Sequence, residues 1–250
     1  MKNLCLCLLV LVFCTSCDDS SEQMDTINLT TNEDAGNSLA YRSDHLMPEN
    51  SDNPYDYSGQ LFLEILSTYY ESNPKPTDMI GIVARIDSIA QQNLGFKEIK
   101  PAFYHAPSLE RIQYFIMNKK SCLEAVVDSS GVSAIGQLSL IGFIDTYLTL
   151  CSGEASYEVV HEFVIAYEKD IIANSLLSVT DKQVILVTTS IARHSAATKK
   201  KRPKKNTDPL WDLLICTVYG SIENAKSSPA EAVTLALASG IVEHLSAPQN

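Results

Sequence analysis

The chain has 250 residues, 45% of them hydrophobic and 20% charged, which is the composition of an ordinary globular protein. Its formal net charge at pH 7 is −11 and its pI is about 4.9. These values argue against non-specific binding to nucleic acid or to anionic lipid head groups, because both would repel the chain. The length fits one domain of ~150–200 residues once the ends are removed.

The first 16 residues have the pattern of a signal peptide. A positive charge at Lys2 precedes an unbroken apolar run from Leu4 to Phe13, and small residues then lead to Cys17. The run is about half as long as the ~20 residues that a helix needs to cross the hydrocarbon core of a bilayer. We therefore expect a leader that is cleaved and not a permanent transmembrane anchor.

The leader ends in "CTSC", residues 14–17, which resembles the lipobox of bacterial lipoproteins. In that family a peptidase cuts directly before the cysteine, whose thiol already carries diacylglycerol through a thioether. The resemblance implies that Cys17 is the first residue of the mature chain and the lipidation site, with acyl chains such as palmitate that hold the protein on a membrane. Cys14 stands where the family more often has leucine. The alternative is a plain secreted protein with a free thiol at Cys17.

The acidic sequence "CDDSSE", residues 17–22, bears on which membrane holds the lipid. In enterobacteria an aspartate after the lipidated cysteine resembles an inner-membrane retention signal, whereas in Bacteroidota acidic residues there resemble a surface-export signal. "NPYDYSGQL" and "TTSIARHS" also resemble uncharacterised lipoproteins of Bacteroidota. That resemblance covers only these two stretches and implies no activity. We expect a bacterial cell-envelope protein, with the outer membrane or cell surface favoured over the inner membrane.

Residues 17–52 follow as the lipidated cysteine and a flexible tether, because they are polar and have no sustained apolar period. From residue 53 to 247, apolar residues recur at helical spacing and almost nothing alternates at period two. The expected helix-start residues are Asn53, Thr77, Ser108, Ser156, Thr180, Asp208 and Ser228. We predict an all-α domain with a single core and seven or eight helices, preceded by a disordered tether.

Three segments of this domain carry further expectations. Residues 133–153 are the most apolar internal run, but Asp145 would offset most of the gain from membrane insertion, so we expect a central core helix. Trp211, the only tryptophan, falls in an apolar stripe and is expected to be buried. Residues 199–207 contain the basic run "KKKRPKK" and are expected to form an exposed loop, with lipid phosphate, polysaccharide or no ligand as its partner.

The sequence offers few candidates for chemistry. Glu158 and His161 have metal-ligand spacing on one helix face, but di-iron bundles use a second Glu-x-x-His and further glutamates, and this chain has no second copy. No nucleophile elbow, phosphate-binding loop or dinucleotide fingerprint occurs. We expect His105 on a loop and His194 on a helix surface. The three cysteines expected in the core are Cys122, Cys151 and Cys216.

The absence of a catalytic spacing favours a binding or scaffolding module at the envelope. Its expected partners are the membrane, through the lipid on Cys17, and an unidentified protein, with no nucleic acid and no cofactor. The alternative is an envelope enzyme with a site that sequence does not reveal, metal-dependent around Glu158 and His161. A pocket that brings these two residues together with a third carboxylate would favour the enzyme.

Overall fold

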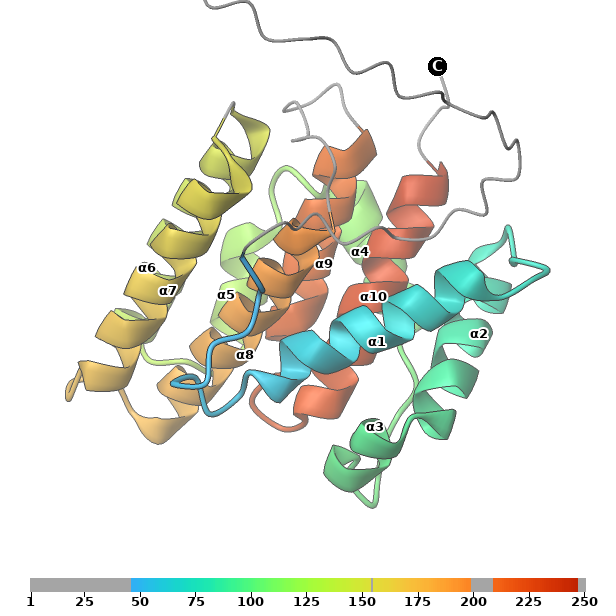
Figure 1. Ribbon diagram of the computed structural model, residues 1–250, viewed down its shortest axis with the longest axis horizontal. Coiled ribbons are helices and arrows are strands. Elements are labelled where there is room, and N and C mark those ends of the chain that lie inside the picture. The colour runs from blue at the N-terminus through green and yellow to red at the C-terminus, as the bar shows by residue number, and fades with distance from the viewer. Residues whose placement is uncertain (1–45, 154, 199–208, 247–250) are drawn as a thin grey trace, which may run out of the picture. The chain divides into compact units, whose positions relative to one another are not determined.

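The computed structural model describes residues 46–153, 155–198 and 209–246, and the side chains of all of these except 209–214 and 246. Ten helices and no strand lie within these residues, so the predicted all-α class is confirmed (Figure 1). The helices are α1 (Tyr57–Glu71), α2 (Met79–Gln92), α3 (Leu94–Ile99), α4 (Leu109–Asn118), α5 (Leu123–Ser129), α6 (Ala134–Ser152), α7 (Tyr157–Ala173), α8 (Val179–Ala197), α9 (Pro209–Glu223) and α10 (Pro229–Ser246). Several predictions fall outside the described residues: those for the signal peptide, Cys17, the tether up to residue 45, the loop at 199–207, Asp208 and the side chain of Trp211.

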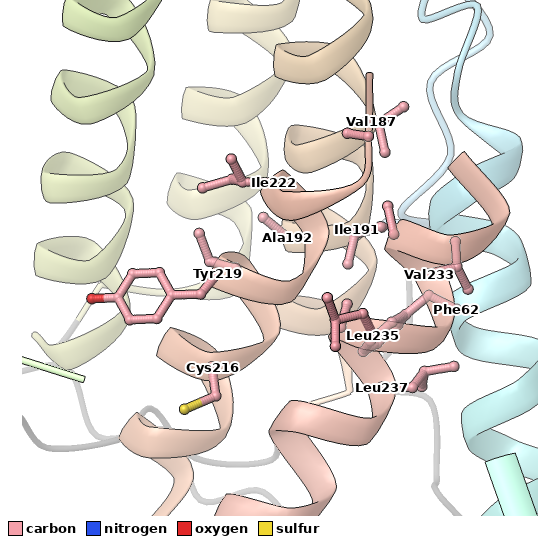
Figure 2. Close-up of a cluster of buried hydrophobic side chains, with 14 of the residues drawn as sticks. Phe62, Val187, Ile191, Ala192, Cys216, Tyr219, Ile222, Val233, Leu235 and Leu237 are labelled. Atoms are coloured by element: carbon pink, nitrogen blue, oxygen red, sulfur yellow. The ribbon is translucent and has the colours of Figure 1, made fainter. Parts of the chain in front are cut away.

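Three helices from the second half of the chain, α8, α9 and α10, form the centre of the fold. Residues 184–197 of α8 are all buried, as are nearly all of residues 230–243 of α10. α9 and α10 approach closely at Gly220, where a Cβ would lie 2.7 Å from the Cα of Ala236. Figure 2 shows buried side chains from α1, α8, α9 and α10 meeting in this centre. The predicted single core is therefore built mainly on these three helices.

The remaining helices pack around this centre. α1 crosses α8 and α10, α2 lies against α10, and α7 lies against α8 (Figure 1). α4 packs on α10 and α9, while α5 packs on α9. α3 follows α2 directly and packs on it and on α10.

α6 lies in the outer layer, so the prediction of a central core helix at 133–153 is wrong in its position. Seven of its 19 residues are buried, while Ile135 and Leu138 are 51% and 76% exposed. Among the described helices, α6 alone is long and apolar enough to cross a membrane, with 33% of its apolar stretch buried. Core helices of soluble proteins meet the same length and composition criteria. Apolar composition thus does not identify the central helix here, because α8 occupies the centre with many polar side chains.

Local capping signals fix several helix starts as predicted. The hydroxyls of Ser108 and Ser156 each accept a hydrogen bond from the backbone N–H three residues later. Ser133 caps α6 in the same way, although it was not among the predicted starts. Ser228 accepts the same bond from Glu231 before α10. Such caps satisfy helix N–H groups that otherwise have no partner within the helix.

Other helix starts differ from the prediction. α2 is capped by Asp78 and not by Thr77. α8 is capped by Ser178, in a capping box with Asp181, and not by Thr180. α1 begins at Tyr57 because Asn53 accepts a hydrogen bond from the Tyr55 N–H in the preceding turn. α3 and α5, with six and seven residues, were not predicted, because they are too short to show a helical period.

The packed part of the chain begins earlier than the predicted boundary at residue 53. Leu46 packs against the core and Pro48 is buried. The Nδ2 atom of Asn50 donates to Glu168 Oε2 over 2.6 Å. Residues 46–52 therefore belong to the helical domain and not to the tether.

Candidate functional site

Arg193 on α8 is the largest side chain that the described fold buries completely. Its Nη2 atom lies 2.6 Å from Asp56 Oδ1, just before α1, and 3.3 Å from Glu168 Oε2 on α7. Removing a charge from water costs several kcal/mol, so a guanidinium at this depth requires carboxylate partners. Arg193 thus ties three separate segments of the chain together.

Glu168, which is also fully buried, accepts hydrogen bonds from several donors besides Arg193. Asn53 Nδ2 and Thr189 Oγ1 donate to its Oε1 over 2.9 and 2.8 Å, and Asn50 donates to its Oε2. The group contains one guanidinium and two carboxylates, so one negative charge has no cation to balance it. The hydrogen-bond donors stabilise that charge. We call this group the Arg193 cluster; its members are Asn50, Asn53, Asp56, Glu168, Thr189, Ser190 and Arg193.

Ser190 joins the cluster to the crossing of α1 and α8. Its hydroxyl donates to the Asp56 carbonyl and accepts from the Gly59 N–H, both over 3.0 Å. A Cβ at Gly59 would lie 2.6 Å from the Ser190 carbonyl oxygen and closer still to the His194 ring. Glycine is required here because α1 comes this close to α8. The stretches "NPYDYSGQL" and "TTSIARHS" therefore meet at this crossing.

His194 lies at the same crossing, so its predicted position on a helix surface is wrong. The ring is 0% exposed, and its Nδ1 lies 3.0 Å from the Ser190 carbonyl oxygen. Burial, reinforced by the nearby Arg193 charge, lowers the pKa of His194 to about 4, so the ring is neutral at pH 7. Nδ1 then carries the proton as donor to Ser190, and Nε2 is left as an acceptor. Nε2 has no hydrogen-bond partner among the described residues.

A pocket of about 330 Å³ adjoins this ring, and we call it the His194 pocket. It is lined by Glu49, Gln60, Leu63, Glu64 and His194. Gln60 donates its amide to Asp56 Oδ2 over 3.1 Å, and Glu64 Oε2 accepts from Asn93 over 2.8 Å. The pocket thus combines two carboxylates with a buried neutral imidazole. Two of its lining residues adjoin the Arg193 cluster: Gln60 is bonded to Asp56, and His194 follows Arg193 in the chain.

Glu158 and His161 do not form a joint site in the structure. Glu158 is exposed in the first turn of α7, whereas His161 is buried. Burial, followed by the nearby charge of Arg193, lowers the pKa of His161. No group of three or more His, Cys, Asp or Glu side chains in the described part of the chain could hold a metal ion.

Other predicted positions are confirmed. His105 lies on an exposed loop, 3.4 Å from Glu231. Cys122, Cys151 and Cys216 are buried in the core, and none of the three is in a disulfide.

Sequence reasoning missed the Arg193 cluster and its pocket. Neither Asp56 nor Glu168 lies in a sequence pattern that predicts a site, because Asp56 stands near a helix start and Glu168 on an amphipathic helix. The one available signal was the shared resemblance of the two stretches that carry Asp56 and Arg193. No family model, curated protein or solved structure matches the chain.

Proposed function

We propose that this protein is a lipid-anchored module of the bacterial envelope that binds a small ligand in the His194 pocket. The anchor part of the proposal rests on the sequence, through the leader and the lipobox-like ending at Cys17. The binding part rests on one observation. A pocket of about 330 Å³ lies against the fully buried His194 ring, and the polar side chains of Glu49, Gln60 and Glu64 line it.

The chemistry of the lining supports binding over catalysis. A general base works best when its pKa is near the working pH, whereas burial and Arg193 hold the pKa of His194 near 4. The Nδ1 atom of His194 faces a backbone carbonyl, and no serine or cysteine among the described residues lines the pocket. Binding requires only the groups that are already in place.

The Arg193 cluster supports binding by holding these groups in position. It fixes α8 to the segment before α1 and to α7 through buried, charge-assisted hydrogen bonds. His194 follows Arg193 directly, and Gln60 is bonded to Asp56. A wall that is already rigid loses little conformational entropy when a ligand binds.

Metabolic labelling with radioactive or clickable palmitate tests the anchor. Wild-type protein should take up the label and begin at Cys17, and Cys17→Ala should remain an unlabelled precursor. Cys7→Ala is the matched control, because it removes a cysteine from the apolar run and leaves the lipobox intact. Label on Cys17→Ala, or a mature N-terminus at another residue, would refute lipidation.

A further inference from the structure

We infer that one end of the helical domain docks on the surface of the lipid bilayer to which Cys17 is anchored, an inference that rests on the anchor part of the proposed function. This end lies where α6 and α8 begin and α7 ends. We call it the apolar end, because it presents four large exposed apolar side chains: Ile135, Leu138, Leu176 and Val179. A bilayer surface would remove from water the apolar area that the fold leaves exposed there.

Hydrogen bonds to one buried carboxylate hold the two segments of the apolar end together. Asp181 accepts from the backbone N–H and the hydroxyl of Ser133 over 2.6 and 2.9 Å. It accepts from the same two groups of Ser178 over 2.9 and 2.8 Å. A Cβ at Gly136 would lie 2.8 Å from this carboxylate. The four apolar residues are each at most two positions from Gly136 or Ser178 in the chain, so they gather at the same end of the fold.

The apolar end differs from the rest of the described surface in its lack of charge. Residues 131–142 and 174–180 contain no acidic or basic residue and no histidine. Each of the other large apolar side chains that the described residues expose has an acidic or basic residue within three positions in the chain. Asp181 follows Val179 closely, but it is 1% exposed and fully bonded. The apolar end can therefore enter a lipid surface without taking an exposed charge out of water.

Charged side chains border the apolar end. Lys182 donates to the Ile172 carbonyl over 2.7 Å, and a Cβ at Gly131 would lie 2.7 Å from the Nζ of Lys226. Asp128 accepts from the Gln137 amide over 3.3 Å. An apolar patch with a polar rim is typical of surfaces that bind a protein or a membrane. Lysines at such a rim can keep their ammonium groups at the level of the lipid phosphates while the apolar side chains lie deeper.

The anchor favours the membrane over a protein as the occupant. Leu46 is the first described residue and stands 29 positions after Cys17, and a chain of that length reaches ~100 Å at full extension. A domain of ~200 residues has a radius of gyration of only ~16 Å, so the anchor allows any face to turn toward the bilayer. The chain has a net charge of −11. Because most of its surface prefers water, the face with the least charge is the one that gains most from contact with lipid.

The positions of nearby charges limit how deeply the apolar end enters. Asp145 is the first charged residue of α6 and lies ten positions after Ile135, which is ~15 Å along a helix. Lys169 and Asp170 are exposed in the last turn of α7, ~5 Å from its end. Elements that lie in the membrane interface bury their apolar side chains by ~5–10 Å. The expected depth is therefore interfacial, and α6 does not cross the bilayer although its length and composition would allow it.

Photo-crosslinking to lipid acyl chains tests the docking. The full chain, purified with its own lipid, is placed in vesicles of phosphatidylcholine that include a phosphatidylcholine with a diazirine on its acyl chain. Flotation separates vesicle-bound protein, and mass spectrometry identifies the labelled peptides. We expect label in the peptides that contain residues 131–142 and 174–180, and salt should not reduce it because the contact is apolar. Val159, an exposed apolar side chain beside Glu158 at the other end of α7, should take no label.

A matched pair of variants locates the contact. Leu138 and Leu94 are 76% and 75% exposed, so aspartate at either position leaves the core unchanged. Leu138→Asp should reduce labelling of the apolar end about tenfold, because the new carboxylate must leave water on docking. Leu176→Asp, in the loop before α8, should have the same effect. Leu94→Asp, on α3, should be labelled like wild type, and circular dichroism verifies that each variant is folded.

The outcomes separate docking from anchoring. A wild-type chain that does not float with the vesicles would overturn the lipid anchor and the docking together. A chain that floats but takes no label at the apolar end would overturn the docking alone and leave this end to a protein partner or a second copy of the chain. Equal labelling of the apolar end in wild type, Leu138→Asp and Leu176→Asp would also overturn the docking while keeping the anchor.

Discussion

Replacement of Gly59 by alanine should destabilise the protein because of the close crossing of α1 and α8. The added Cβ would lie 2.6 Å from the Ser190 carbonyl oxygen and from His194 Cγ. Both neighbours are fully buried and fixed in α8, so neither can move away without disturbing the core. α1 must therefore shift as a unit.

Three contributions determine how much the free energy of unfolding falls in Gly59→Ala. Forcing extra volume into a packed core costs ~1–3 kcal/mol, and loss of the hydrogen bond from the Gly59 N–H to Ser190 costs about 1 kcal/mol more. The higher helix propensity of alanine offsets at most about 1 kcal/mol. The net loss in the free energy of unfolding should be about 2 kcal/mol, or ~4–8 °C in Tm for a domain of this size.

Gly142→Ala provides a matched control, since the same atom is added to a helix where it meets nothing. Gly142 is exposed in the middle of α6, and no atom lies within 4 Å of its added Cβ. This variant should gain up to about 1 kcal/mol from helix propensity alone. Urea unfolding, followed by circular dichroism at the helical band, measures both variants. Gly59→Ala within about 0.5 kcal/mol of wild type would refute the tight crossing.

Three further outcomes can be measured in the same way. Deleting residues 46–52 from the mature chain should lower the free energy of unfolding by about 1–3 kcal/mol, through the lost Asn–carboxylate hydrogen bond and buried surface; unchanged stability would show that this segment is part of the tether. Arg193→Met should cost ~3–5 kcal/mol by leaving two buried carboxylates uncompensated, and adding Glu168→Gln should recover part of that loss. Between pH 6.5 and 5, the free energy of unfolding should fall by about 1.5 kcal/mol as the pH falls, because unfolded His194 binds a proton at its ordinary pKa whereas the folded ring does so only near 4; His194→Asn should remove most of that slope.

The features of the fold that depend on local chemistry could be predicted from the sequence. Ser108 and Ser156 cap their helices through bonds that span three residues, and an apolar period reports which face of a single helix is buried. The layer in which a helix lies depends on its partners. α6 is apolar and lies outside, while α8 lies at the centre although six of its buried residues from 188 to 195 are polar or charged.

The candidate site could not be predicted because its members are far apart in the chain. Asp56 and Arg193 are separated by 137 positions, and Asn50 and Glu168 by 118. The polar residues of "TTSIARHS" indicate an exposed helix face when each is judged alone. They become a buried network only when the segment before α1 and the adjacent helix α7 supply partners for them. Spacing within one helix contains no information about those partners.

The position of the pocket connects the proposed anchor with the proposed binding site. Glu49 lines the pocket, and Asn50, Asn53 and Asp56 belong to the Arg193 cluster. In the chain these residues follow the tether that would lead from a lipid on Cys17. The segment by which the domain would be attached therefore also forms part of the pocket that we propose as the binding site. Loss of its buried hydrogen bonds would remove Glu49 from the pocket and uncover Glu168, so folding of this segment and ligand binding must be coupled.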